Sequence, residues 1–348
     1  MGLLDRVKVA GTVKSAEILS ESTFFNEKDV IPTDLPILNV AFSGKLDGGL
    51  VPGLTVFAGA SKTFKTLLGL FCIKAFLTKY PDSICLFYDS EFGVTPQYLK
   101  SNGIDASRVL HIPIENIEQL KFDVVKRLEA IERKDKVIIF VDSIGALSSK
   151  KEVEDAIDEK SVADMTRAKS IRSLFRIITP HLTTKDIPCI VINHVYQTME
   201  LYAKTILSGG TSIMYSSNQV FIITKSQEKD GTDIVGWNFT INIEKSRFVK
   251  EKSKFMFLVN YDKGIQRYSG LLELAIEGKF ILNTKQGWYN KVDLTTGEIA
   301  ENDKGIRLKT LMEDVDFWEN LLISEKFKTF VSSKYQFTSE SMIDYIAK

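Results

Sequence analysis

The sequence predicts an α/β fold in which a mostly parallel central sheet is flanked by helices and extended by antiparallel edge strands. Short apolar runs recur along the chain, and runs without polar alternation are typical of strands covered on both faces. Amphipathic segments with helical spacing separate these runs, as right-handed strand–helix–strand crossovers require. After residue 219 the strands follow one another directly, which indicates antiparallel additions at one edge of the sheet.

The predicted strands are the apolar runs of the central region. They cover residues 54–58, 84–89, 109–112, 137–142, 188–194 and 219–224, followed by 237–244 and 254–261. Helices are predicted over 66–80, 116–134 and 163–182. Asn116, with Gln119 three residues later, predicts a capping box at the start of the second helix. Three zones result: a leader (1–30), an α/β core (31–270) and a small C-terminal α/β domain (271–348).

Composition limits the chain to a packed globular protein. Of its 348 residues 44% are hydrophobic, which excludes a wholly disordered chain. The 45 basic and 45 acidic residues cancel, so nucleic acid would have to bind a local basic patch. The three cysteines are widely spaced in apolar runs, which indicates buried thiols in a reducing cytoplasm. We expect no transmembrane segment and no signal peptide.

Residues 59–66 carry the strongest chemical signal, because they lie between a predicted strand and a predicted helix. In such a loop, backbone N–H groups and the helix N-terminus surround phosphate oxygens. We therefore predict a nucleotide site formed by Gly59, Ala60, Ser61, Lys62, Thr63, Phe64, Lys65 and Thr66. Lys65 is expected to reach the β- and γ-phosphates, and the Thr66 hydroxyl to ligate Mg²⁺.

Phe64 departs from the usual pattern, which has glycine before the lysine. A Cβ at this place crowds the loop if the backbone needs a positive φ. The alternative interpretation is an ordinary strand–helix turn in which the spacing of Gly59 and Lys65 arises by chance. The remaining polar residues of the predicted site lower the weight of that alternative.

Two strand ends add carboxylates to the predicted site. Asp142 ends the strand 137–142, where an acid near the phosphate loop can hold Mg²⁺ through its water shell. Asp89 and Glu91 follow at the end of the strand 84–89, and a carboxylate beside the γ-phosphate can deprotonate the attacking water. The alternative for these residues is the turn chemistry that is common at strand ends.

Several segments of the chain, in their sequence, order and spacing, resemble the RecA-family recombinases, most closely those of T4-like bacteriophages. They are the phosphate loop with its Phe64, followed by residues 87–93, 137–143, 191–194, 209–217 and 244–254. The resemblance covers about residues 20–290. It implies a RecA-like P-loop core in an ATP-dependent DNA recombinase, active in recombination, repair and recombination-dependent replication. Such a protein is a DNA-dependent ATPase that forms helical filaments on single-stranded DNA and exchanges homologous strands, in the cytoplasm of a host bacterium if viral.

The resemblance also assigns roles around the nucleotide. It makes Glu91 the catalytic base and His194 the residue that senses the γ-phosphate. Tyr98 matches an aromatic that stacks on adenine, and Tyr268 a second aromatic near the base. Without the resemblance, His194 is a strand-end histidine bonded to a carbonyl, and Tyr98 is a packing residue of a helix.

Two further roles concern contact between subunits. Lys245 and Arg247 match basic residues that reach the γ-phosphate of the neighbouring subunit and stabilise charge in the transition state. The alternative is a solvated charge run in a hairpin. The leader is expected to dock onto the next subunit through Phe24 and Phe25, unless both belong to the subunit's own core.

Residues 148–161 and 195–210 fit neither a strand nor a helix and correspond to the DNA-binding loops of the family. Cations and glycines suit phosphate contact and aromatic rings suit bases. The candidate DNA-binding residues are Arg167, Lys169, Tyr196, Tyr202, Lys204, Gly209 and Gly210. The alternative is a pair of surface loops, and the acidic second half of the first loop opposes phosphate contact along its whole length.

The resemblance implies single-stranded and double-stranded DNA as partners, together with a single-strand-binding protein and a recombination mediator. One rival is a ring-forming helicase or motor ATPase on the same core, for whose extra domain the short leader leaves little room. The other is a nucleotide switch that does not hydrolyse ATP. The phage relatives usually end in a long acidic tail, whereas the sequence here stops at Ser-Met-Ile-Asp-Tyr-Ile-Ala-Lys, either because the tail is naturally short or because the chain was trimmed.

Overall fold

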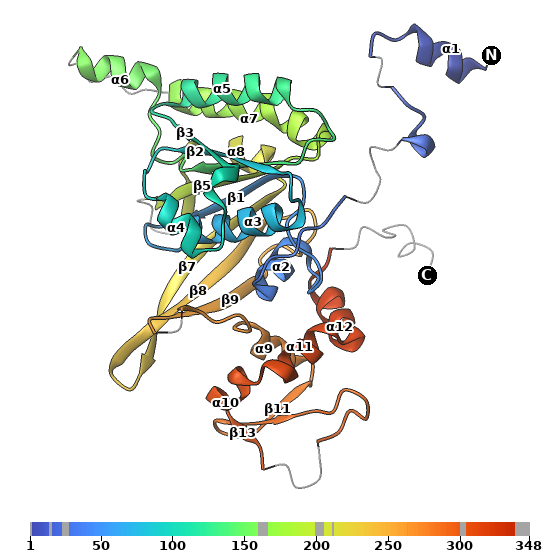
Figure 1. The fold of residues 1–348 in the computed structure, drawn as a ribbon, viewed down its shortest axis with the longest axis vertical. Coiled ribbons are helices and arrows are strands. Elements are labelled where there is room, and N and C mark those ends of the chain that lie inside the picture. The colour runs from blue at the N-terminus through green and yellow to red at the C-terminus, as the bar shows by residue number, and fades with distance from the viewer. Residues whose placement is uncertain are drawn as a thin grey trace.

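The computed structural model describes residues 2–13, 16–22, 28–158, 166–198, 205–210, 212–262, 264–299 and 304–337. Within these residues a large mixed sheet carries helices on both faces, and a smaller C-terminal unit follows it (Figure 1). No helix of this part of the chain is long and apolar enough to cross a membrane.

The strands of the central sheet are β1 (Gly53–Gly59), β2 (Ile84–Asp89), β3 (Val109–Pro113), β4 (Val137–Asp142), β5 (Pro188–Gln197), β6 (Thr205–Leu207), β7 (Gln219–Asp230), β8 (Asp233–Lys245), β9 (Lys254–Asn260) and β10 (Gly264–Ile265). Their order is β10-β9-β8-β7-β1-β5-β4-β2-β3, with β6 paired to β5. β1 to β5 are parallel, and β7 is parallel to β1. β8, β9 and β10 pair antiparallel, which confirms the predicted mixed sheet with an antiparallel edge.

The helices of the core are α2 (Pro36–Ser43), α3 (Lys65–Lys79), α4 (Pro96–Ser101), α5 (Ile117–Ala130), α6 (Lys150–Ile157), α7 (Thr166–Thr184) and α8 (Ser212–Ser216), with a 3₁₀ turn, η3, over Ala106–Arg108. The C-terminal unit contains α9 (Leu271–Glu277), β11 (Ile281–Lys285), β12 (Trp288–Lys291), β13 (Ile306–Arg307), α10 (Leu308–Glu313), α11 (Val315–Ile323) and α12 (Glu325–Tyr335). The leader holds α1 (Leu3–Ala10) and the 3₁₀ turn η1 (Leu19–Glu21).

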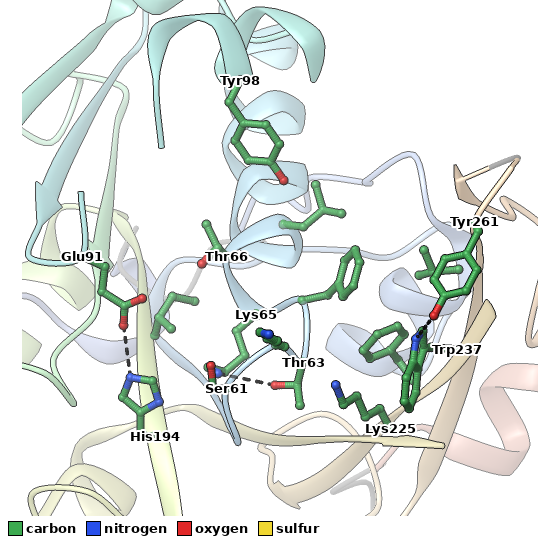
Figure 2. A pocket seen from close by; sticks show the side chains of 16 residues that line it. Ser61, Thr63, Lys65, Thr66, Glu91, Tyr98, His194, Lys225, Trp237 and Tyr261 are labelled. Carbon is green, nitrogen blue, oxygen red and sulfur yellow. Dashed lines mark hydrogen bonds and ion pairs between the residues drawn. The ribbon is translucent and has the colours of Figure 1, made fainter. Parts of the chain in front are cut away.

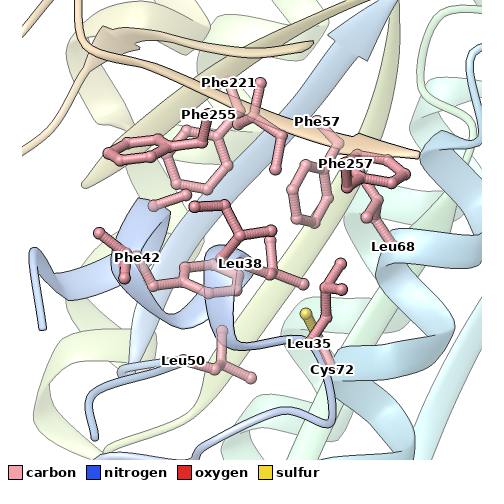
Figure 3. Packing of buried hydrophobic residues seen from close by; sticks show 14 of the residues in the cluster. Leu35, Leu38, Phe42, Leu50, Phe57, Leu68, Cys72, Phe221, Phe255 and Phe257 are labelled. Atoms are coloured by element: carbon pink, nitrogen blue, oxygen red, sulfur yellow. The ribbon is translucent and has the colours of Figure 1, made fainter. Parts of the chain in front are cut away.

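Alternate residues of the strands feed two hydrophobic clusters, one on each face of the sheet. On one face, α2 and α3 pack on the sheet, and Figure 3 shows Phe42 of α2 against Phe57 and Phe221. Trp318 and Phe327 of the C-terminal helices belong to the same cluster. The opposite face is covered by α5 and α7.

Helix α3 lies unusually close to the sheet because of one glycine. A Cβ on Gly69 would lie 2.3 Å from the ring of Phe140 in β4, so a larger residue would push the helix outward. This close approach fixes the N-terminus of α3 relative to the ends of the parallel strands. The phosphate loop is thereby held at the carboxyl edge of the sheet.

The start of α5 differs in detail from the predicted capping box. The Asn116 side chain does accept a hydrogen bond from Gln119 N at 3.0 Å. The Gln119 side chain, however, accepts from the N–H of Glu115 at 2.8 Å rather than from that of Asn116. The helix therefore begins where the sequence places it, with the reciprocal bond moved back by one residue.

The leader extends away from the core as a separate arm (Figure 1). Its helix α1 has no buried residue, and Leu3, Leu4, Val7 and Val9 are all at least 60% exposed. The apolar side chains of α1 therefore have no packing partner among the described residues of this subunit. Phe24 and Phe25 lie outside the described residues.

Candidate nucleotide site

The loop between β1 and α3 presents the predicted phosphate-binding residues. Lys65 is the first residue of α3, where the unbonded backbone N–H groups of the helix begin. Its buried ammonium donates to the carbonyl of Ala60 at 2.7 Å and reaches Thr63 Oγ1 at 3.4 Å. Burial lowers the pKa of Lys65, while the charges of Glu91 and Asp142 act in the opposite direction. Its partners in the loop are uncharged, so the cation remains available for a phosphate.

Phe64 adopts the conformation that its sequence position puts in question. Its φ of 58° and ψ of 20° are left-handed, a state that costs a residue with a Cβ about 1–2 kcal/mol. The side chain offsets part of this strain, because its ring packs on Phe239 of β8 with centroids 4.7 Å apart. Aromatic pairs of this kind contribute about 0.5–1.5 kcal/mol beyond area burial. Phe64 thus ties the phosphate loop to the antiparallel edge strands.

Asp142 lies beside the first turn of α3 and is 3% exposed. Its Oδ2 accepts a hydrogen bond from Thr66 Oγ1 at 2.7 Å, whereas its buried Oδ1 has no hydrogen-bond partner among the described residues. Burial, together with the charges of Glu91 and Asp89, raises the pKa of Asp142 to about 6 against the opposing effects of Thr66 and Lys65. An unsatisfied buried carboxylate oxygen next to a hydroxyl is a donor set that fits Mg²⁺.

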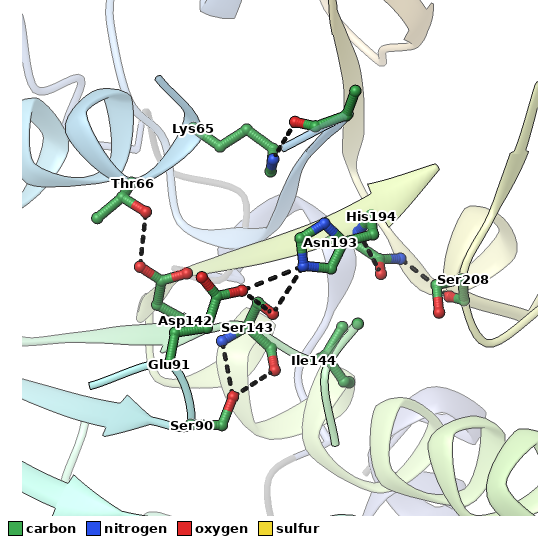
Figure 4. Close-up of polar contacts among 12 residues, drawn as sticks. Lys65, Thr66, Ser90, Glu91, Asp142, Ser143, Ile144, Asn193, His194 and Ser208 are labelled. Carbon is green, nitrogen blue, oxygen red and sulfur yellow. Dashed lines mark hydrogen bonds and ion pairs between the residues drawn. The ribbon is translucent and has the colours of Figure 1, made fainter. Parts of the chain in front are cut away.

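Glu91 joins residues from three strand ends (Figure 4). Its Oε1 accepts a hydrogen bond from Ser143 Oγ at 2.7 Å and lies 3.1 Å from His194 Nε2. Ser143 in turn lies 3.4 Å from His194 Nε2 and exchanges hydrogen bonds with Ser90. The carboxylate is therefore oriented by a hydroxyl and an imidazole while it remains 40% exposed toward solvent.

Asp89 takes a different place from Glu91, because the chain turns directly after β2. Its Oδ1 accepts hydrogen bonds from the N–H groups of Glu91 and Phe92, and its Oδ2 lies 3.0 Å from His111 Nε2. Asp89 is therefore a turn residue, which is the alternative role that the sequence left open for Asp89 and Glu91. Glu91 is the one that lines the cavity described next.

A cavity of about 550 Å³ opens beside the phosphate loop (Figure 2). The predicted residues that line it are Ser61, Lys62, Thr63, Phe64, Lys65, Thr66, Glu91, Tyr98 and His194. Lys225, Trp237 and Tyr261, which the sequence did not predict, line the side formed by β7, β8 and the turn after β9. Tyr261 directly follows the last residue of β9, and an aromatic at the end of a predicted strand was the available signal.

Tyr268 does not line this cavity. Its ring stacks on Trp318 with centroids 5.7 Å apart, and its hydroxyl donates to Glu319 Oε1 at 2.6 Å. It is 7% exposed and joins the core to the C-terminal helices. Tyr261 is the tyrosine that lines the cavity on that side, beside Trp237 and Phe239, because β9 ends there and the chain then continues away along β10.

Comparison with known proteins identifies the family. The family model for the RecA N-terminal domain matches residues 25–266, which is more than half of the chain. The chain belongs to the RecA family. A second model, for the C-terminal domain of the recombination and repair protein of bacteriophage T4, matches residues 268–331.

Individual relatives agree with this assignment. The chain is 50% identical over 336 residues to the recombination and repair protein of Enterobacteria phage T4, covering 96% of this chain and 86% of that protein. It is 28% identical over 304 residues to the RecA protein of Tropheryma whipplei, covering 85% and 66% of the two chains. With the RecA protein of Streptomyces avermitilis it shares 28% identity over 281 residues, or 79% and 71%.

The basic pair expected to act between RecA-family subunits lies outside this subunit's own cavity. Lys245, at the end of β8, donates to the carbonyls of Met214 and Tyr215 at 2.6 and 3.2 Å. Burial lowers the pKa of Lys245, and the nearby Arg247 lowers it further. Arg247 lines a separate hollow with Lys45 and Phe248. Neither cation contacts the phosphate loop of its own chain, as a role in a neighbouring site requires.

The candidate DNA-binding residues of this RecA-family chain differ in accessibility. Lys169 and Tyr196 are exposed, and Gly209 and Gly210 both have a φ of 85°. Arg167 donates instead to the carbonyls of Ile144, Gly145 and Leu147 and to Ser208 Oγ. It thereby joins the start of the first expected DNA loop to the end of the second. Phosphate contact would require its guanidinium to leave these acceptors. Tyr202 and Lys204 lie outside the described residues.

Part of the first expected DNA loop is helical. Residues 150–157 form α6, which begins with a capping box in which Ser149 and Glu152 each bond to the other's backbone. This local bonding outweighs the charge density that suggested an irregular loop. The structure does not describe residues 159–165 between α6 and α7.

Proposed function

We infer that this protein forms helical filaments on single-stranded DNA in the presence of ATP and Mg²⁺, and exchanges homologous strands within them. As a member of the RecA family it is a DNA recombinase and a DNA-dependent ATPase. One observation supports the site most directly. A buried lysine and an oriented glutamate line one cavity at a strand–loop–helix turn, and a buried carboxylate suited to magnesium bonds to Thr66 of the same cavity.

The cavity residues divide the work of hydrolysis. Lys65 and the N–H groups at the start of α3 bind phosphate oxygens and stabilise the negative charge that develops there. Thr66 and Asp142 would hold Mg²⁺, which neutralises charge on the phosphates when it is bound. Glu91, oriented by Ser143, accepts the proton of the attacking water. Tyr98 contacts the nucleotide at the end of the cavity away from the loop.

Hydrogen bonds link the cavity to the second DNA loop. The carbonyl of His194 accepts from the N–H of Ser208 at 2.9 Å, and the side chain of Asn193 donates to the carbonyl of Ser208 at 3.0 Å. A change at the His194 ring is therefore transmitted to both ends of the segment 195–210. In our proposal this link makes DNA affinity depend on the γ-phosphate.

Assembly completes the site from outside the subunit. Lys245 and Arg247 serve the nucleotide of the neighbouring subunit, and the leader, with its exposed α1, docks on a neighbour. Lys169, Tyr196, Gly209 and Gly210 contact single-stranded DNA, and the double-stranded partner is taken up by the same filament. A single-strand-binding protein and a recombination mediator complete the set of proposed partners.

The test compares Glu91→Gln with the wild-type chain. ATP turnover is measured with and without single-stranded DNA, and electron microscopy examines the assemblies formed with ATP and DNA. We expect the variant to lose about 10²–10⁴-fold in turnover while it still forms filaments, because only the proton acceptor is removed. Glu129→Gln, an exposed acid on α5, is the matched control with normal turnover. Unchanged turnover in Glu91→Gln, or closed rings in place of helices, would overturn the proposal.

A further inference from the structure

Arg167, in the first turn of α7, joins two segments of the chain that follow different strands. Its Nε donates to the carbonyl of Leu147 at 2.6 Å, and one terminal nitrogen donates to the carbonyls of Ile144 and Gly145 at 3.1 and 3.0 Å. The same nitrogen donates to Ser208 Oγ at 3.2 Å. The first three acceptors follow β4 and Ser208 follows β6, so one guanidinium holds both segments.

The bonds of Arg167 depend on the geometry that distinguishes arginine from lysine. A planar guanidinium presents several donors in a fixed fork, whereas an ammonium is a single point of charge. Here the side chain is half-buried, and all four of its acceptors are uncharged oxygens. An anion could bind the guanidinium only after these hydrogen bonds were broken. The arrangement therefore favours a role in fixing the backbone over a role in binding phosphate.

Both segments that Arg167 holds border His194. A Cβ on Gly145 would lie 2.5 Å from the His194 ring, so the backbone at Gly145 lies directly against the imidazole. The N–H of Ser208 donates to the carbonyl of His194 at 2.9 Å. The side chain of Asn193 donates to the carbonyl of Ser208 at 3.0 Å (Figure 4). The ring and the backbone of His194 are thus both placed by groups that are bonded to Arg167.

The position of His194 matters for Glu91, because His194 Nε2 lies 3.1 Å from Glu91 Oε1. The other partner of this carboxylate among the described residues is Ser143 Oγ, at 2.7 Å, and the glutamate side chain is 40% exposed. A displaced imidazole would therefore reorient the carboxylate. A displacement of about 1 Å at a reacting group can cost about 10²-fold in rate.

We propose that Arg167 is a positioning residue for ATP hydrolysis, which acts through His194 on Glu91, and that it is not a ligand of DNA phosphate. The inference rests on the proposed function, because it takes Glu91 to be the proton acceptor. It also gives the guanidinium a part in the response to DNA. Arg167 bonds to both segments that are expected to bind DNA or to lead into a DNA loop, so a movement of either segment reaches His194 through it.

Steady-state ATP turnover without DNA tests the positioning role. Arg167→Lys keeps the charge and Arg167→Gln removes it, but neither side chain presents the fork that serves both segments. We expect both variants to lose about tenfold or more in kcat. The Michaelis constant for ATP should stay within about twofold, because Lys65 and the rest of the phosphate loop are unchanged. Arg176→Gln, at an exposed arginine of the same helix, is the matched control with normal turnover.

A double-mutant cycle with His194→Ala distinguishes positioning from a merely structural role. If Arg167 acts through the imidazole, Arg167→Gln should cause no further loss of turnover once residue 194 is alanine. Equal losses in the two backgrounds would overturn the proposal, because the effect would then bypass His194. Loss of Mg-ADP binding in both Arg167 variants would also contradict it, since the arginine would then maintain the fold of the whole site.

The salt dependence of single-stranded DNA binding tests the second part of the proposal. With a non-hydrolysable ATP analogue, log affinity against log salt concentration should have the same slope for Arg167→Gln and the wild type. Loss of one phosphate contact would reduce the magnitude of this slope by about 0.7, and that outcome would show that Arg167 binds DNA phosphate after all. Failure of the proposed function gives a different result, because Glu91→Gln would then turn over ATP at the wild-type rate.

Discussion

The two ends of the parallel strands differ in how their charged side chains are paired. At the amino end, Arg108 donates to the carbonyls of Leu77, Tyr80 and Ser83, which lie at the end of α3 and in its connection to β2. Asp186, which precedes β5, pairs with Arg133 at 3.0 Å and with Lys28 at 3.5 Å. Charged groups at this end therefore have ion-pair or carbonyl partners within the subunit, although Asp186 Oδ1 accepts no hydrogen bond from the described residues.

At the carboxyl end, Asp142 and Lys65 form no ion pair with any of the described residues. Asp142 has a buried oxygen without a partner, Lys65 bonds only uncharged groups, and Phe64 holds a left-handed backbone. Each feature costs stability in the free subunit and is relieved, or used, when a ligand arrives. The contrast teaches that the amino end maintains the fold, whereas the carboxyl end is complete only with nucleotide bound.

The largest expected effect is at the phosphate loop. Lys65→Ala should reduce ATP turnover by about 10²-fold or more, because it removes the cation that stabilises the phosphates in the transition state. Its thermal midpoint should stay near that of the wild type, since the lost hydrogen bonds go to a loop carbonyl and a hydroxyl. Turnover and calorimetric melting measure the two quantities. A large drop in the midpoint would contradict the division between the two ends.

The opposite pattern is expected for Arg108→Ala at the amino end. The variant leaves three carbonyls without their charged donor, which should lower the free energy of unfolding by about 3 kcal/mol. Denaturant titration measures this loss, with Arg133→Ala as a control that removes a more exposed cation. At 25 °C the Michaelis constant for ATP should be unchanged. A changed Michaelis constant would show that the amino end also shapes the cavity.

Asp142→Asn should stabilise the free subunit while it weakens Mg-nucleotide binding. The folded-state pKa of about 6 lies above the ordinary value of 3.8, so this group favours folding at low pH and loses that contribution as the pH rises through 6. At pH 7.5 the variant should be more stable than the wild type by about 1–3 kcal/mol. The difference between the two chains should vanish near pH 4, and denaturant titrations at both pH values test this. A difference independent of pH would contradict the role of the carboxylate charge.

The smallest expected effect is a difference in stability between two variants of Phe64, which separates the cost of its backbone strain from the gain of its ring packing. Phe64→Gly removes both the ring and the left-handed strain, whereas Phe64→Ala removes the ring alone. The glycine variant should therefore be the more stable of the two by about 1 kcal/mol, although alanine is favoured at most positions near a helix start. Paired denaturant titrations measure the difference. Equal stabilities would mean that the backbone relaxes once the ring is gone.

Local patterns predicted most of the fold and the phosphate side of the site. Apolar runs located the strands, and the phosphate loop, Asp142 and Glu91 stood out because each is adjacent to a strand end. The cavity side formed by β7, β8 and the turn after β9 was harder to predict, because its residues come together only through the pairing register of these strands. Trp237 and Lys225 are twelve residues apart in the chain and meet only through that pairing. Tyr268 and Tyr261 could not be distinguished until the path of β9 and β10 was known.

Hydrogen bonds from Asn193 and His194 to Ser208 join the cavity closely to the segment expected to bind DNA. The backbone of β5 carries the cavity histidine and continues directly into that segment, residues 195–210. No hinge or domain rotation is needed for one surface to register the other. Under the proposed function, each subunit would report the state of its own phosphate to the DNA strand that it holds, so DNA release would proceed subunit by subunit along a filament.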